Sequence, residues 1–104
     1  MQPLKDIRVL AVTGFLAGPF ASMNFARLGA EVIKVELPGK GDPVRGNGPF
    51  IGTEGKHPQQ QTPEDISTRF VKPNHGVNCL TLNLKHPRGR HMFLDLAVIS
   101  YVML

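Results

Sequence analysis

The sequence predicts an α/β fold, a Rossmann-like parallel sheet of which this chain forms a part. An aliphatic run at Ile7–Val12, IRVLAV, is typical of a strand buried on both faces of a parallel sheet. A turn, a short helical segment and a second such run at Glu31–Glu36, EVIKVE, follow it. Together they fill about thirty residues, the usual size of a β-α-β unit, whose crossover we expect to be right-handed.

The segment between these two strands has the signals of a tight turn and a helix. Gly14 and Gly18 suit the turn after the first strand, and Pro19 suits the first helical position, where its missing N–H costs nothing. The predicted helix, Pro19–Leu28, directs Phe20 and Met23 toward the core, and the glycine after it is the expected stop. The strand ends and the helix N-terminus then face one crevice, where open α/β sheets bind ligands.

The middle of the chain, from Leu37 to Asn74, lacks a periodic pattern and is rich in Pro and Gly, so we expect an irregular loop. Its polar stretch Gly55–Ile66 is predicted to be an exposed, disordered insertion. A structureless loop of this length is unusual in a compact domain. Either the loop packs on a partner, or the segment is abnormal.

Regular structure is predicted again toward the C-terminus. Val77–Leu84 alternates as a strand does, and Pro87 marks the start of a helix over residues 88 to about 99. The residues expected on its core-facing side are Met92, Leu96 and Ile99, with Phe93 beside them. The last four residues are β-prone, and we expect them to be the cut beginning of a further strand.

Composition restricts the class of partner. The net charge is +4, from twelve Lys and Arg against eight Asp and Glu, and the basic residues are dispersed. They form no platform with aromatic residues of the kind that single-stranded nucleic acid requires, so we expect no nucleic-acid partner. The C-terminal apolar run is too short to span a bilayer and is interrupted by Asp95, so no membrane partner is expected either.

The single cysteine excludes an internal disulfide and favours an intracellular compartment, cytoplasmic or mitochondrial. From residues 1–12 we expect neither a signal peptide nor an Arg- and Ser-rich amphipathic targeting segment. Cys79 falls in a predicted strand and is expected to be a small buried hydrophobe. The four histidines show no metal-ligand spacing, and we assign no metal site.

Several motifs in series resemble the N-terminus of family III CoA-transferases, the CaiB/BaiF type that includes formyl-CoA transferases, succinate–hydroxymethylglutarate CoA-transferases and α-methylacyl-CoA racemases. They are the opening PL-x-x-I-x-VL, LAGPFA at 16–21, LGAEVIKVE at 28–36 and PGKGDPVR at 38–45. GPFIGTE at 48–54, STRFVKPNHG at 67–76 and LTLNLKHPRGR at 80–90 continue the series. Because only 55–66 falls outside, residues 1–104 are expected to be the N-terminal portion of the family's large domain.

The resemblance implies a large Rossmann-like domain, a second small domain and two subunits interlocked as rings in a homodimer. Members transfer CoA from an acyl-CoA thioester to a carboxylic acid through a nucleophilic Asp, with no permanently bound cofactor. GPFIGTE favours acids of the dicarboxylate or short acyl type. The nucleophile lies downstream of Leu104, so this chain is expected to carry part of the CoA-binding region, to have no catalytic residue and to be inactive alone.

Three alternatives stay open at this point. The first is a fragment of an α-methylacyl-CoA racemase-type enzyme, the other branch of the family. The second is a non-catalytic truncated product, which the insertion and the abrupt end favour. The third is a free-standing nucleotide-binding module, which needs a closed core that 104 residues barely supply.

The resemblance also assigns CoA-contacting positions in the first half of the chain. Leu16 and Ala17 match the two contact positions of the turn after the first strand; the family's polar residue is absent at Leu16, so only backbone contacts are expected. Leu37 matches a position where some members use an Arg against the nucleotide. Arg45 matches the Arg of a GD-x-x-R motif and either pairs with a phosphate or, by a slight preference, holds the loop through Asp42.

The remaining positions follow the later strand. Leu82, Asn83, Leu84 and Lys85 match a strand segment that lines the adenine-ribose pocket. Lys85 is the charged candidate there, and a solvated lysine at a strand end is the alternative. The family's Lys-Arg pair is replaced by Val77 and Asn78, which weakens the expected affinity for CoA. Glu36 occupies the place of a ribose-binding acid in dinucleotide folds, but no G-x-G-x-x-G accompanies it.

Overall fold

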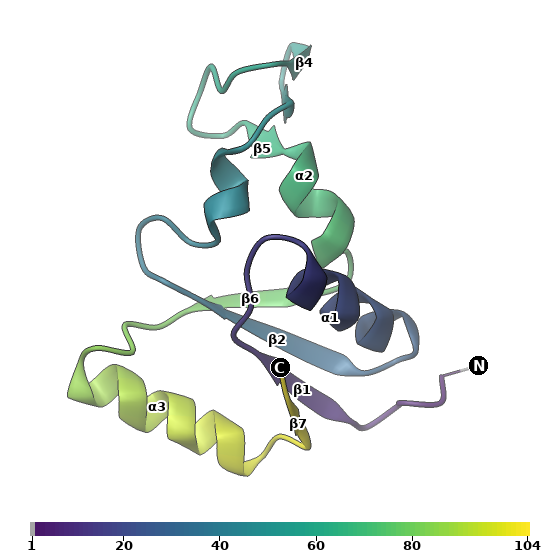
Figure 1. Ribbon diagram of the computed structural model, residues 1–104, viewed down its shortest axis with the longest axis vertical. Helices are drawn as coiled ribbons and strands as arrows, with labels where there is room; N and C mark the ends of the chain where they lie inside the picture. Colours follow the sequence, from purple (N-terminus) through teal and green to yellow (C-terminus); the bar gives the residue numbers. More distant parts are fainter. Residues whose placement is uncertain (1) are drawn as a thin grey trace.

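A four-stranded parallel sheet is the centre of the computed structural model, which describes residues 2–104 (Figure 1). Strand β1 (Arg8–Ala11) pairs with β2 (Glu31–Glu36) on one side and with β7 (Val102–Met103) on the other. Strand β6 (Asn78–Thr81) completes the order β6-β2-β1-β7 by pairing with β2. This is the order of a doubly wound sheet. The predicted α/β class with a Rossmann-like parallel sheet is therefore confirmed.

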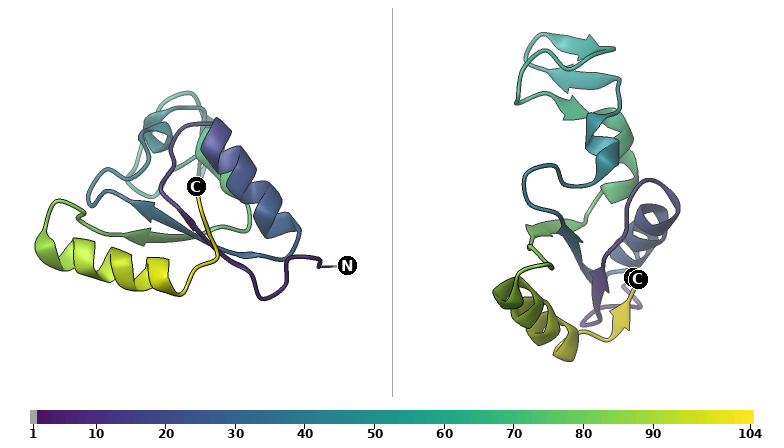
Figure 2. Two further views of the ribbon diagram at one scale, coloured as in Figure 1. Left: turned by 60° about the horizontal axis from the view of Figure 1, so that its bottom comes forward. Right: turned by 60° about the vertical axis from the view of Figure 1, so that its left-hand side comes forward.

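Helices cover both faces of this sheet, as Figure 2 shows. Val9 and Ala11 of β1 belong to a core cluster on which α1 (Ala17–Arg27) packs through Phe25 and Ala26. Leu10, which points to the opposite face of the strand, belongs to a second cluster. Helix α3 (Pro87–Val98) covers that cluster with Phe93, Leu96 and Ala97. Val9, Leu10 and Ala11 of β1 are completely buried and thus form the centre of the core.

The predicted helices are present, with differences in register. Helix α1 starts at Ala17, and Pro19 is its third residue; this is tolerated because the first-turn N–H groups have no intrahelical partners in any case. Met23 is buried as predicted, whereas the prediction for Phe20 is wrong, because its side chain is 54% exposed. Phe25 and Ala26 pack against the sheet, and Met23 is buried together with Pro19 and Ser22.

Helix α3 has Pro87 at its first position, as predicted, and the ring Nδ1 of His86 accepts the N–H of Arg88 as an N-terminal cap. The predicted core face is rotated only in part: Leu96 and Phe93 face the sheet as predicted, whereas the predictions for Met92 and Ile99 are wrong. Met92 and Ile99 are exposed, and the sheet-facing residues are Phe93, Leu96 and Ala97.

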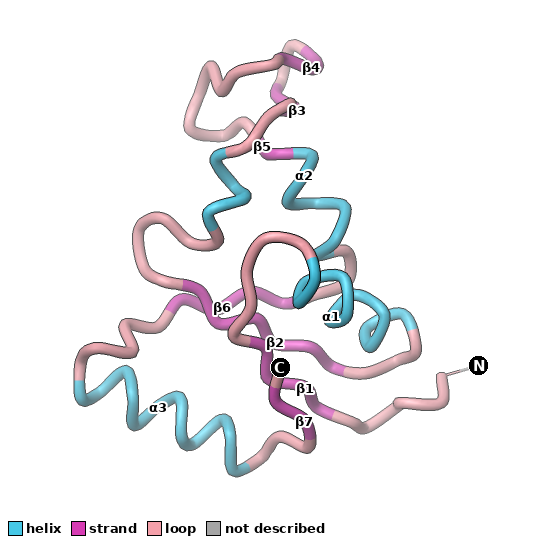
Figure 3. Tube along the Cα trace, viewed as in Figure 1, coloured by secondary structure: helices cyan, strands magenta, loops and turns pink. Residues whose placement is uncertain are grey.

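The prediction of an irregular middle is wrong. Residues 43–74, which we call the small lobe, contain the elements η1 (Pro43–Gly46), β3 (Phe50–Gly52), β4 (Gly55–His57), β5 (Ile66–Ser67), α2 (Thr68–Val71) and η2 (Lys72–Asn74). The three strands form an antiparallel sheet in the order β4-β3-β5. Figures 1 and 3 show the lobe projecting from the parallel sheet as short helical and strand pieces joined by loops.

The stretch from Gly55 to Ile66 also has a defined conformation. Phe50 of β3 pairs with His57 of β4. The carboxylate of Asp65 accepts the N–H groups of Gln61 and Thr62, at 2.8 and 3.2 Å, and the hydroxyl of Thr62 at 2.9 Å. The expectation of disorder is thus not met in this structure, while the interpretation of 55–66 as an insertion stays a prediction.

Within residues 2–104, every helix is too short or too polar to cross a bilayer.

Candidate functional site

The carboxyl edge of the parallel sheet gathers three chain segments. The turn after β1, the loop after β2 and the segment after β6 all start there. A small cavity of about 200 Å³ lies between the first two of these segments. Its lining includes Thr13 and Gly14 from the turn and Leu37 and Gly41 from the loop. Ligands of open α/β sheets bind at this edge.

The N-terminus of α1 opens toward this edge. Its N-cap, Leu16, supplies no side-chain cap, and its side chain is 68% exposed. The N–H groups of Ala17 and Gly18 are in the first turn, where the helix itself provides no acceptor. With the helix dipole they form a partial positive charge that suits an anionic group. Gly18 is required here because a Cβ at this position would overlap the side chain of Thr13.

A buried carboxylate fixes this turn. Asp42 Oδ1 accepts the N–H of Phe15 at 3.1 Å and that of Val44 at 3.0 Å, and Oδ2 lies 2.5 Å from Lys34 Nζ. Burial raises the pKa of Asp42, but the hydrogen bond from Lys34 and those from the two N–H groups outweigh it, so the pKa lies below its usual value. Asp42 is therefore charged near neutral pH.

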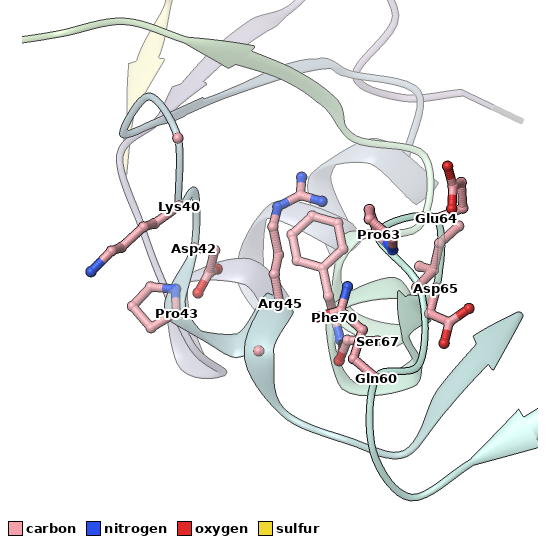
Figure 4. A pocket seen from close by; sticks show the side chains of 13 residues that line it. Lys40, Asp42, Pro43, Arg45, Gln60, Pro63, Glu64, Asp65, Ser67 and Phe70 are labelled. Atoms are coloured by element: carbon pink, nitrogen blue, oxygen red, sulfur yellow. Dashed lines mark hydrogen bonds between the residues drawn. The ribbon is translucent and has the colours of Figure 1, made fainter.

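A second pair, Glu36 and Arg45, lies next to the first. Arg45 Nε and Nη2 donate to Oε1 and Oε2 of Glu36, each at 2.7 Å. This hydrogen bonding lowers the pKa of Glu36 from 4.5 to about 2, against the opposing effect of burial. The Arg45 guanidinium also stacks on Phe70, 3.6 Å from the ring centroid (Figure 4). Both pairs thus connect β2 to the chain that follows it.

These contacts correct the predicted partner of Arg45. Arg45 braces the loop, as the preferred interpretation had it, but through Glu36 and not through Asp42. The Glu36 oxygens accept from Arg45 and from the Asp42 N–H, so the structure gives no support to a ribose-binding role for Glu36.

A larger cavity, of about 570 Å³, lies beside Arg45, between η1 with the end of the preceding loop on one side and the segment from Gln60 to Phe70 on the other (Figure 4). Its lining combines basic and acidic side chains, among them Lys40, Arg45, Glu64 and Asp65. The charges do not converge on one ligand, because Arg45 is paired with Glu36 and Asp65 with backbone groups. We therefore place the candidate site at the sheet edge.

The four residues from Leu82 to Lys85 lie in the connection between β6 and α3, not in a strand as predicted. Leu82 is buried against Leu10, and its N–H donates to the Glu36 carbonyl at 3.1 Å, which places this segment beside the end of β2. Leu84 is partly buried against the same cluster, while Asn83 and Lys85 are exposed. The Asn83 side chain accepts the Lys85 N–H at 3.1 Å.

Seven of the eight predicted CoA-contacting residues thus lie in segments that follow the carboxyl ends of β1, β2 and β6: Leu16, Ala17, Leu37, Leu82, Asn83, Leu84 and Lys85. Arg45 lies behind them as a brace. The structure brings the segments to one edge, and contact with CoA itself stays a prediction.

The sequence analysis did not identify two residues of the site, Lys34 and Asn74. Lys34 is fully buried, and Asn74 Oδ1 accepts from its Nζ at 3.1 Å. A lysine inside an otherwise aliphatic strand was the available signal, because buried lysines are rare unless they are paired. The expectation for Cys79 is wrong, since this residue is exposed. Residues 2–104 bring together no group of His, Cys, Asp and Glu that suits a metal ion.

Comparison with known proteins gives consistent matches. Residues 4–104 match CoA-transferase family III. The chain is 45% identical over 103 residues to the succinyl-CoA:glutarate CoA-transferase of Mus musculus. That match covers 98% of this chain and 21% of the relative. It is 42% identical over 96 residues to the succinyl-CoA:mesaconate CoA-transferase of Haloarcula marismortui. That match covers 92% of this chain and 22% of the relative.

Solved structures agree with these relatives. A CaiB/BaiF family protein from Brucella suis superimposes with a TM-score of 0.84 at 33% identity, over 98% of this chain and 25% of that one. The chain spans about a fifth of the length of the curated relatives it matches.

Proposed function

The chain belongs to CoA-transferase family III, and from this premise we propose that it carries part of the CoA-binding region of an enzyme that transfers CoA from an acyl-CoA to a carboxylic acid. The names of the relatives support a dicarboxylate as the acid, since they combine succinyl-CoA with glutarate or mesaconate. The enzyme's substrates would be the CoA thioester and the acid, and its subunits would form the family's interlocked homodimer.

The observation that carries the proposal is the uncapped N-terminus of α1 at the sheet edge. The N–H groups of Ala17 and Gly18 suit an anionic or carbonyl oxygen of CoA, and Leu16 contributes through its backbone. Leu37, at the end of β2, offers an exposed apolar side chain to the nucleotide. The segment after β6 adds an exposed amide and an exposed amine, on Asn83 and Lys85.

The two buried aspartates of the chain, Asp42 and Asp65, are not free to act as nucleophiles. Asp42 is buried and already accepts three hydrogen bonds, and Asp65 is held in the same way. A nucleophilic carboxylate must approach the thioester carbonyl with a free lone pair. We propose that the 104-residue chain alone gives no turnover, and that its part in the enzyme is to bind and orient CoA.

The test is a titration of the ¹⁵N-labelled chain with coenzyme A. We expect the amide resonances of Leu16, Ala17 and Gly18 to shift at millimolar CoA, because these N–H groups face the ligand. Lys85→Gln should weaken binding about threefold, the loss of one exposed charge contact. Lys56→Gln, which alters an exposed lysine in the distant strand β4, is the matched control and should leave the affinity unchanged.

Two results would contradict the proposal. Unshifted amides at millimolar CoA would exclude this edge as a CoA site. Formation of glutaryl-CoA from succinyl-CoA and glutarate, by a preparation free of any full-length homologue, would disprove the inactivity of the chain.

A further inference from the structure

The ion pair between Lys34 and Asp42 is almost completely buried, and a contribution to folding stability does not account for its presence in the core. The two side chains are 1% and 0% exposed, and their Nζ and Oδ2 atoms lie 2.5 Å apart. Removing two charges from water is costly, and an apolar pair of similar volume is often as stable or more so. A buried pair of this kind therefore calls for a function other than stabilising the core.

The pair acts on the turn before α1. Asp42 Oδ1 accepts the N–H of Phe15, the residue before the N-cap, at 3.1 Å. Phe15 has a φ of 60°, in the left-handed region that side-chain-bearing residues disfavour. The carboxylate thus holds Phe15 in a conformation that its own side chain does not favour, and this conformation fixes the direction in which the chain enters the helix.

Lys34 in turn fixes the carboxylate. Its Nζ is held by Asp42, by Asn74 Oδ1 at 3.1 Å and by the Phe70 ring, whose centroid is 5.2 Å away. Asn74 is itself anchored, because its side-chain amide donates to the Phe70 carbonyl at 2.8 Å. The position of Asp42 is therefore set by β2 and by the small lobe together.

We propose that Lys34 and Asp42 are positioning residues for the ligand: the pair sets the conformation of the turn at Phe15 and so aims the free N–H groups of α1 at the sheet edge. The ligand assignment rests on the proposed function, whereas the effect on the turn does not. A pair that merely stabilised the core would leave the turn unchanged when replaced by an apolar pair.

Two double variants separate these roles. Lys34→Met with Asp42→Leu removes the charges without leaving one unpaired, and it removes the acceptor of the Phe15 N–H. Lys34→Gln with Asp42→Asn also removes the charges but keeps an acceptor oxygen at position 42. The measurements are the thermal midpoint, the hydrogen-exchange protection of the Phe15 amide, and the affinity for coenzyme A.

We expect the apolar variant to fold, to lose protection at Phe15 and to bind CoA about tenfold more weakly, the loss expected for one hydrogen bond to a charged group. The polar variant should restore the protection and keep the affinity within about twofold of the native chain. Phe15→Gly in the apolar background should restore part of the affinity, because glycine adopts a positive φ without strain.

The outcomes distinguish this inference from the proposed function. A folded apolar variant with native protection at Phe15 would overturn the inference, whether or not CoA binds. Native affinity in that variant would overturn it while the proposed function stands. Absence of CoA binding by the native chain would refute the proposed function, and protection at Phe15 alone would then decide whether the pair sets the turn. If the apolar variant does not fold, the polar variant decides. The inference would be overturned if the polar variant keeps native protection at Phe15 but binds coenzyme A more weakly.

Discussion

The pair of Glu36 and Arg45 gives a quantitative prediction. Replacing Glu36→Gln keeps the shape of the side chain and removes its charge. The hydrogen bonds from Arg45 lower the pKa of Glu36 from 4.5 to about 2, which corresponds to roughly 3 kcal/mol at about 1.4 kcal/mol per pH unit. Because the Arg45 side chain is 39% exposed, solvent screens part of this energy. We expect a loss of about 2 kcal/mol in the free energy of unfolding at neutral pH.

The pH dependence follows from the direction of the change. The pKa of Glu36 is lower in the folded chain than in the unfolded one, so its contribution is complete above about pH 4.5 and is lost as the pH falls toward 2. The difference in stability between the native chain and Glu36→Gln should therefore be constant near neutral pH and shrink below about pH 4.5. Asp42 titrates in the same direction but is present in both proteins, so its contribution cancels.

The assay is urea unfolding followed by circular dichroism at a series of pH values. Glu54→Gln, which alters an exposed carboxylate of the small lobe, is the control and should cost less than about 0.5 kcal/mol. A stability difference for Glu36→Gln that is independent of pH between 2 and 5 would refute the assigned role of the carboxylate. So would equal losses in the two variants at neutral pH.

Three further predictions concern close approaches and the cysteine. Gly18→Ala should lower the free energy of unfolding by about 1–3 kcal/mol, because the added methyl overlaps Thr13. Gly89→Ala, in α3, should cost about 3 kcal/mol, since its methyl overlaps the backbone carbonyl of Asn83, which cannot move as a side chain can. Cys79 is exposed as a residue, but partial shielding of its thiol from water and the nearby Glu36 carboxylate raise the thiol pKa, so it should react with iodoacetamide more slowly than a peptide thiol at mildly alkaline pH.

The control for both glycine variants is Gly46→Ala, because a Cβ at this position meets nothing within 4 Å. Urea unfolding should place its loss below about 0.5 kcal/mol. Equal losses in the three alanine variants would contradict the overlaps inferred for Gly18 and Gly89. Alkylation of Cys79 at the rate of an unstructured thiol would contradict its raised pKa.

The parallel sheet was predictable because its signals are local. The aliphatic run around β1 and the proline at the start of α3 determine their elements whatever lies elsewhere in the chain. Which face of α3 packs on the sheet was harder to predict from the sequence, because the apolar residues of this helix lie on more than one side. Which of them faces the sheet depends on the path of the preceding turn, where Gly89 packs against the Asn83 carbonyl.

The small lobe was not predictable in the same way. Its strands have two or three residues each, too few for an alternating pattern to be recognised. Their pairing depends on contacts between distant residues, such as the N–H of Thr68 donating to the Pro49 carbonyl. The candidate site has the same limit. The contact role of Leu16 was assigned by resemblance, whereas the hydrogen bond from the neighbouring Phe15 N–H to Asp42 joins residues far apart in the sequence and is found only in the structure.

The charges of β2 explain why this edge has a fixed shape. Val32, Lys34 and Glu36 alternate with residues that face α3, so they share one face of the sheet. The face is apolar at Val32, where α1 packs, and charged toward the carboxyl end, where the small lobe packs. Each charge is paired with a residue of the loop or of η1 that follows. Substitutions of Lys34 or Glu36 should therefore change the conformation of the loops at the ligand edge, although neither residue contacts the ligand.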